Sequence, residues 1–150
     1  MPFRFRYRIG VALALAALSA APAWALEFRS VAADAAVLYD APSAKARKLY
    51  VVNRGYPVEV VVVVEGWIKV RDANGELTWV ESKALSDQRT VMIKVPLAQI
   101  RQAADDGSPV VFQAQQNVIL ELEDVAGAWL RVKHRDGQSG FIKAADVWGA

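Results

Sequence analysis

Few side chains in this sequence could do covalent or metal chemistry. The chain has no cysteine and one histidine, His134. The lack of cysteine rules out disulfides, thiolate metal ligands and thiol nucleophiles. A single histidine argues against a histidine-based zinc site and against a serine–histidine triad. We expect His134, beside Asp136-Gly137, to be an exposed turn residue.

The carboxylates and serines form no recognisable catalytic pattern. No motif sets two carboxylates across a cleft at the spacing a glycosidase needs. The paired candidates are Asp105, Asp106, Glu121, Glu123 and Asp124. Ser43, Ser82 and Ser108 lie in no motif that supplies a base. We therefore expect no catalytic residue, no metal and no cofactor, and a carboxylate enzyme without a known motif is the remaining catalytic alternative.

A group of cations and aromatic residues in the first half of the chain is the best candidate for ligand binding. Such residues can hold an anionic partner, for example a polymer or an acidic lipid surface. The candidates are Tyr39, Lys45, Arg47, Lys48, Tyr50, Arg54, Tyr56 and Trp67. The alternative is an ordinary solvated loop, because loops are where charges normally lie. For Trp67 and the similar Trp129, the alternative to a groove wall is packing within the fold.

Val58–Val64 is the most unusual stretch of the chain. Strand alternation predicts that Val58, Val60, Val62 and Val64 point inward and that Val61 and Val63 point outward. Exposed apolar residues on a strand need cover. We therefore predict that Val61 and Val63 form an interface with the second half of the chain or with a partner protein.

The first 25 residues have the pattern of an export signal. Three arginines precede a 13-residue apolar run, Ile9–Ala21, and Ala23-Trp24-Ala25 supplies small residues before a cleavage point. The run is too short to span a bilayer as a helix. The alternative is an uncleaved N-terminal anchor.

Removal of this segment changes the charge of the chain. The full sequence has a net charge of +2, whereas residues 26–150 hold 15 basic and 16 acidic residues, a net charge of −1. No later stretch is long and apolar enough to span a membrane. We therefore expect an exported, periplasmic or secreted protein that binds no nucleic acid and has no transmembrane segment after cleavage.

The remaining chain contains an ungapped internal repeat. A shift of 62 residues superimposes Val31–Leu85 on Ile93–Val147. Trp67 falls on Trp129 and Gly75 on Gly137, and apolar residues keep their columns. This predicts two tandem modules, residues 26–88 and 89–150.

Each module reads as short strands with tight turns. Trp67–Arg71 and Trp129–Lys133 alternate in polarity, and each is followed by a hairpin turn, Asn74-Gly75 or Asp136-Gly137. No segment after the signal keeps a helical period. The pattern predicts an all-β fold of two small barrels.

The order V-E-V, G-W-I-K-V, N-G, W-V resembles the bacterial SH3-like (SH3b) domain, and A-W-L-R-V, D-G, G-F-I resembles it again. The tandem arrangement behind a signal is similar to secreted bacterial SH3-domain proteins of uncharacterised function. The resemblance implies two tandem SH3-like barrels and a non-catalytic envelope module that binds cell-wall material or a wall-associated protein. The alternative is a structural or assembly protein acting only through protein contacts. The proline and tyrosine of the peptide-binding eukaryotic SH3 groove are missing after Trp79-Val80.

Overall fold

The computed structural model describes residues 25–150 and contains strands, turns and two short 3-10 turns, with no α-helix among these residues. The predicted signal, residues 1–25, lies outside the described residues except for Ala25. Within the described part of the chain, no helix is long and apolar enough to cross a membrane. The all-β prediction is confirmed.

The first repeat forms one seven-stranded antiparallel sheet in the order β3-β2-β6-β5-β4-β1-β7. Its strands are β1 (Phe28–Val31), β2 (Ala35–Tyr39), β3 (Lys48–Asn53), β4 (Pro57–Val64), β5 (Trp67–Arg71), β6 (Leu77–Glu81) and β7 (Leu85–Ser86). A 3-10 turn, η1 (Ser82–Ala84), joins β6 to β7.

The second repeat forms an equivalent sheet in the order β10-β9-β13-β12-β11-β8-β14. Its strands are β8 (Thr90–Ile93), β9 (Leu97–Arg101), β10 (Val110–Gln115), β11 (Ile119–Ala126), β12 (Trp129–Lys133), β13 (Ser139–Lys143) and β14 (Val147–Trp148), with η2 (Ala144–Asp146) before β14. Every strand lies 62 residues after its counterpart, so the repeat found in the sequence is a repeat of structure.

Each sheet encloses its own core of aliphatic side chains. The first core is centred on Leu38, Val58, Ile68, Val70 and Val80, and the second on Ile100, Leu120, Leu130, Val132 and Ile142. The paired columns are fully buried because the alternation of each strand directs them inward. The hairpin turns are as predicted: Gly75 and Gly137 have φ of 84° and 100°, values that glycine adopts without strain.

The valine-rich strand β4 departs from simple alternation. A β-bulge between Val60 and Val62 shifts its pairing with β5, and β11 carries a bulge at the matching place. Val62 and Val64 are 44% and 40% exposed, so the prediction that they point inward is wrong. The bulge adds one residue to the strand and turns the last four valines outside the core.

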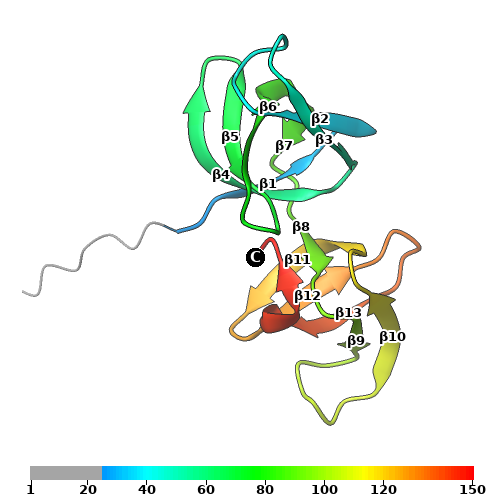
Figure 1. The fold of residues 1–150 in the computed structure, drawn as a ribbon. Helices are drawn as coiled ribbons and strands as arrows, with labels where there is room; N and C mark the ends of the chain where they lie inside the picture. The colour runs from blue at the N-terminus through cyan, green and yellow to red at the C-terminus, as the bar shows by residue number, and fades with distance from the viewer. Residues whose placement is uncertain (1–24) are drawn as a thin grey trace, which may run out of the picture.

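The two sheets are joined by a short linker and touch along one side (Figure 1). The C-terminal strand β14 returns to this junction. Trp148 stacks edge-on against Phe28 of β1, with ring centroids 5.2 Å apart, and its indole Nε1 donates a hydrogen bond to the carbonyl oxygen of Pro57 at 3.3 Å. Arg89 packs its guanidinium over the Phe28 ring at 5.6 Å. A tryptophan of the second repeat is therefore anchored on the first.

A second contact lies at the turn before β4. The Thr90 hydroxyl donates a hydrogen bond of 2.6 Å to the carbonyl oxygen of Gly55. Gly55 has a φ of 83°, and a Cβ built there would lie 3.3 Å from Ile119 Cγ2 of the second repeat. Glycine is needed here both for its backbone conformation and for the close approach of the two repeats.

Candidate functional site: a groove between the two repeats

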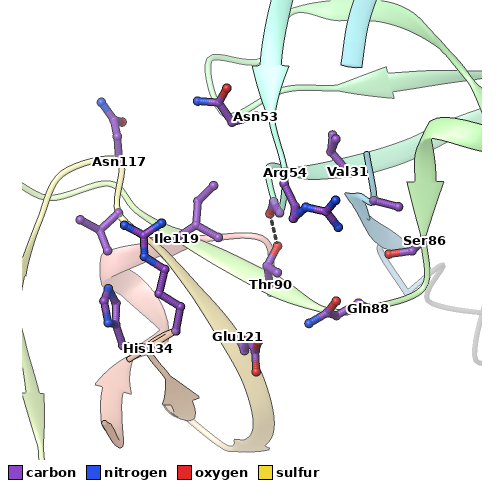
Figure 2. A pocket seen from close by; sticks show the side chains of 14 residues that line it. Val31, Asn53, Arg54, Ser86, Gln88, Thr90, Asn117, Ile119, Glu121 and His134 are labelled. Atoms are coloured by element: carbon purple, nitrogen blue, oxygen red, sulfur yellow. Dashed lines mark hydrogen bonds between the residues drawn. The ribbon is translucent and has the colours of Figure 1, made fainter. Parts of the chain in front are cut away.

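A cavity lies between the two repeats (Figure 2). It encloses about 670 Å³, which is within the usual size of a ligand site. The first repeat contributes Asn53 and Arg54, and the second contributes Asn117, Glu121 and His134. We call this cavity the first lobe.

A second cavity of about 570 Å³ adjoins the first and shares Asn53, Asn117 and Ile119 with it. We call it the second lobe. Its remaining walls come from Tyr56 in the first repeat and from Met92 and Lys94 in the second, together with Val51, Val52, Ala73, Asn74, Ile93 and Gln116. The two lobes together form one groove, which we call the inter-repeat groove.

The turn that carries Asn117 positions side chains for both lobes. Asn117 has a φ of 70°, the only positive value at a non-glycine among the described residues. It occupies the column of Gly55, so both repeats use the left-handed conformation at the same turn. Asparagine tolerates this conformation better than most residues. It also places an amide group between the two lobes.

Charged side chains line both walls of the first lobe. Arg54 donates from Nη2 to Asp34 Oδ1 at 2.7 Å, and this carboxyl is 96% exposed. From the opposite wall come His134 and the exposed Arg135, both in the β12–β13 turn. Glu121 supplies one carboxylate. The first lobe therefore has cations on two sides, from two different repeats.

The geometry of His134 is fixed by its own turn. Its Nδ1 lies 3.3 Å from the backbone nitrogen of Asp136, which donates to it, and 3.0 Å from Asp136 Oδ1. The ring also packs against Phe112, with centroids 6.1 Å apart. A backbone hydrogen bond from Gln138, followed by the contact with His134, lowers the pKa of Asp136 below its usual value. Asp136 is therefore ionised beside His134 at neutral pH.

The second lobe is less charged and contains a half-buried phenol. Tyr56 packs on the first core, and burial raises the pKa of its hydroxyl above the usual value of 10.0. Gln116 donates from Nε2 to the carbonyl oxygen of Lys94 at 3.2 Å. This lobe therefore offers an aromatic ring and amide groups to a ligand, with Lys94 at its edge.

Comparison of the two repeats separates residues the fold needs from residues it does not. When the two repeats are aligned by the 62-residue shift, the residues that match Arg54, His134 and Arg135 are Gln116, Asp72 and Ala73. Asp72 makes the same kind of turn contact as His134, accepting hydrogen bonds from the backbone of Asn74 and Glu76 at 2.9 Å. Because the same fold forms with either set, the cations of the first lobe are not a requirement of the barrel.

The structure brings together only part of the predicted ligand-binding set. Arg54 and Tyr56 line the inter-repeat groove. Lys45, Arg47 and Lys48 are exposed and lie outside the lining of both lobes, with Arg47 paired to Asp40 at 3.3 Å. Their ligand-binding role stays a prediction.

The other predicted aromatic residues, Tyr39, Tyr50 and Trp67, lie outside the lining of both lobes. Tyr39 is 6% exposed and stacks edge-on against Trp67 at 5.3 Å between centroids. Tyr50 is 47% exposed, and a hydrogen bond with Glu76 raises the pKa of its hydroxyl. The Tyr39–Trp67 pair fits the packing alternative better than an open groove wall, because Tyr39 is buried and Trp67 is in contact with it.

Val61 and Val63 are 39% and 59% exposed, and the junction between the repeats is built from other residues. Their predicted contact with a partner protein therefore stays a prediction. Sequence reasoning missed Asn117 and Arg135 and treated His134 as a simple turn residue. These residues can be found in the sequence by aligning the two repeats and looking for positions where the residue types differ.

No group of three or more histidine, aspartate or glutamate side chains is arranged to hold a metal ion within residues 25–150. The lining of the groove offers hydrogen bonds, charge and apolar contact to a ligand.

Residues 32–87 and 94–149 each match the profile of the bacterial SH3 domain family. The two matches are again separated by 62 residues. No curated protein matches the chain. The family profile therefore covers both sheets and most of the described residues.

Solved structures similar to this chain include NlpC2 from Trichomonas vaginalis, with a TM-score of 0.39, 16% identity, and coverage of 84% of this chain and 49% of that one. An NlpC/P60 family protein from Bacillus cereus has a TM-score of 0.37 and 16% identity, with coverage of 81% of this chain and 55% of that one. The Endolysin LysPBC5 CBD has a TM-score of 0.31 and 15% identity, with coverage of 82% of this chain and 92% of that one. The chain spans about half the length of the NlpC structures it matches.

Proposed function

This chain belongs to the bacterial SH3 domain family, and from that premise we propose that it is a non-catalytic binding module of the bacterial cell envelope. Its ligand is cell-wall material or a wall-associated protein, and it reaches the periplasm or the outside of the cell by means of the signal in residues 1–25. The two modules, residues 26–88 and 89–150, act together.

The observation that carries this proposal is the inter-repeat groove. Neither repeat contains it alone, because Asn53 and Arg54 come from the first and Asn117 and Ile119 from the second. Its two lobes share Asn53, Asn117 and Ile119, and together they suit an elongated ligand better than a small compact one. A chain molecule such as a wall polymer can lie along both lobes and contact both repeats at once.

Sedimentation with purified cell-wall sacculi tests the proposal. The purified protein is mixed with sacculi over a range of concentrations, and the bound fraction is measured in the pellet. We expect saturable retention. A protein that stays in the supernatant at every concentration contradicts wall binding.

The exposed valines favour one second candidate, a structural or assembly role through protein contacts alone. Val61–Val64 are 39% to 59% exposed on one strand, and such surface on a soluble protein marks a contact site. This candidate gains if sacculi do not retain the protein while a defined envelope protein co-purifies with it and is lost in a Val63→Glu variant.

Neutralising the loop cations separates the two binding surfaces of the first repeat. If Lys45→Gln, Arg47→Gln and Lys48→Gln together weaken retention on sacculi more than Arg54→Gln does, the ligand lies on the loop. If Arg54→Gln has the larger effect, the ligand lies in the inter-repeat groove.

A further inference from the structure

We propose that the first lobe binds an anionic group, a carboxylate or a phosphate, carried by an extended polymer and held between Arg54 of the first repeat and Arg135 of the second. This inference rests on the proposed function for the choice of the inter-repeat groove, and it names the chemistry of the ligand.

Arg54 is oriented by Asp34, but this contact does not occupy all of its N–H donors. Its Nε and Nη2 lie 3.3 Å and 2.7 Å from Asp34 Oδ1, and the side chains of Arg54 and Asp34 are 65% and 96% exposed. Exposed pairs of this kind contribute little stability, so a ligand anion that replaces Asp34 gives up little. A guanidinium has five N–H donors, so donors remain for a ligand in the lobe.

Arg135 faces the lobe from the second repeat without a neutralising partner. Within residues 25–150 no carboxylate forms an ion pair with it. The turn that carries it is held rigid by the backbone hydrogen bonds from His134 N to Gln138 O at 2.7 Å and from Gly137 N to His134 O at 2.9 Å. A rigid turn keeps the base of a long side chain in place, which reduces the ordering cost of binding.

His134 adds a polar ring to the lining of the lobe. Its Nδ1 is engaged by Asp136, which leaves Nε2 for a ligand. The counter-charge is Glu121, the one carboxylate in the lining. Two arginines and one carboxylate line the lobe, and Asp34, outside the lining, neutralises Arg54 until a ligand displaces it. The amides of Asn53, Asn117 and Gln88 complete the polar wall of the lobe.

The shape of the site favours a polymer over a flat membrane. The two arginines come from different repeats and line one cavity, so a ligand that contacts both must enter this cavity, which a planar array of lipid head groups cannot do. A chain that enters the first lobe can continue into the second, where Tyr56 and Lys94 meet it. The anionic groups therefore belong to a flexible chain.

The test uses substitutions that the fold already accepts in its other repeat. Arg54→Gln and Arg135→Ala place in each repeat the residue that the other repeat has at that column. Lys69→Gln and Lys83→Ala are matched controls, because they remove the same charge outside the groove and outside the loop of Lys45, Arg47 and Lys48. Circular dichroism melts confirm that all four variants fold.

Binding is measured with fluorescent poly-L-glutamate, with fluorescent polyphosphate and with phosphatidylglycerol vesicles. We expect Kd for at least one polymer to rise about tenfold or more in the Arg54→Gln/Arg135→Ala double variant, since each lost contact is a charge-assisted hydrogen bond. The lysine controls should change Kd less than about twofold. The polymer that responds identifies a carboxylate or a phosphate as the ligand group.

Equal weakening by the lysine controls overturns the inference, because it would show a general charge effect. Binding to vesicles alone overturns it as well, and so does the absence of binding to either polymer. If sacculi retain the double variant and the parent protein equally, the inference is overturned but the proposed function stands. Groove-dependent polymer binding without retention on sacculi overturns the proposed function alone.

Discussion

Thr78 places a buried hydroxyl in β6 without a hydrogen-bond partner among the described residues. Thr78 is 1% exposed, and the matching residue of the second repeat is Gly140. A Cβ at Gly140 would lie 2.6 Å from the carbonyl oxygen of Arg101, so that column is tight in the second repeat. The first repeat accommodates a larger side chain there but leaves its hydroxyl unsatisfied.

We therefore expect Thr78→Val to stabilise the first repeat. The change keeps the shape of the side chain and removes an unsatisfied polar atom, which we expect to raise the free energy of unfolding by about 1 kcal/mol. Chemical denaturation measures this difference. A fall in stability would show that the hydroxyl has a partner in solution.

Tyr56 gives a residue-level test based on pH. Burial raises the pKa of its hydroxyl, so the folded protein holds that proton more tightly than the unfolded chain does. The free energy of unfolding should be insensitive to Tyr56 below about pH 10 and should fall as the pH rises through the folded-state pKa. Denaturation at a series of alkaline pH values measures this, and Tyr56→Phe should remove that part of the loss.

Trp67 shows how far a residue's role can be read without a structure. The sequence left two alternatives, a groove wall or packing, and its edge-on contact with Tyr39 supports packing. We expect Trp67→Ala to lower the free energy of unfolding by about 2–4 kcal/mol, somewhat below the cost for a fully buried ring. Urea denaturation measures it. A near-neutral result would favour the groove alternative for Trp67.

At the scale of elements, the strands were predictable and their irregularities were not. Trp67–Arg71 and Trp129–Lys133 form strands with the predicted bounds because alternating apolar residues and a turn glycine determine them locally. The bulge in β4 was not predicted, because its run of valines has no polar residue to mark which face is solvated. The signal lies only in the second repeat, where the consecutive acids Glu123 and Asp124 align with Val61 and Val62. Val62 and Val64 were misplaced for that reason.

The exposed end of β4 makes a prediction of its own. If Val61 contacts a partner protein, Val61→Glu should change the oligomeric state or abolish a complex, because a carboxylate cannot be buried without a partner. Light scattering and thermal melting of the variant measure both properties. Unchanged melting together with unchanged assembly would contradict a contact role for Val61.

At the scale of the whole molecule, the junction is what the sequence did not reveal. The repeat predicts two modules, but contacts such as Thr90 with Gly55 depend on how the modules meet, and no local pattern encodes that. Arg135 belongs to the candidate site only because of this arrangement. Arg54 and Tyr56 were found because cations and aromatic residues are conspicuous in a sequence.

Trp148 should couple the two repeats. Trp148→Ala removes the contact with Phe28 and the hydrogen bond to Pro57, and we expect a loss of about 2–4 kcal/mol. Calorimetry should show one transition in the parent protein and two in the variant. Trp148→Phe keeps the ring contact and should lose less. A single transition in Trp148→Ala, at the parent's Tm, would contradict this coupling.

The central claim is that the inter-repeat groove binds the wall ligand, and a blocked groove tests it most directly. Asn53 is exposed and borders both lobes, so Asn53→Trp should fill the groove without disturbing either core. Gln115→Trp, at the same column of the second repeat and outside both lobes, is the control. We expect sacculi to retain the parent protein and Gln115→Trp but not Asn53→Trp. Equal retention of all three proteins would contradict the claim.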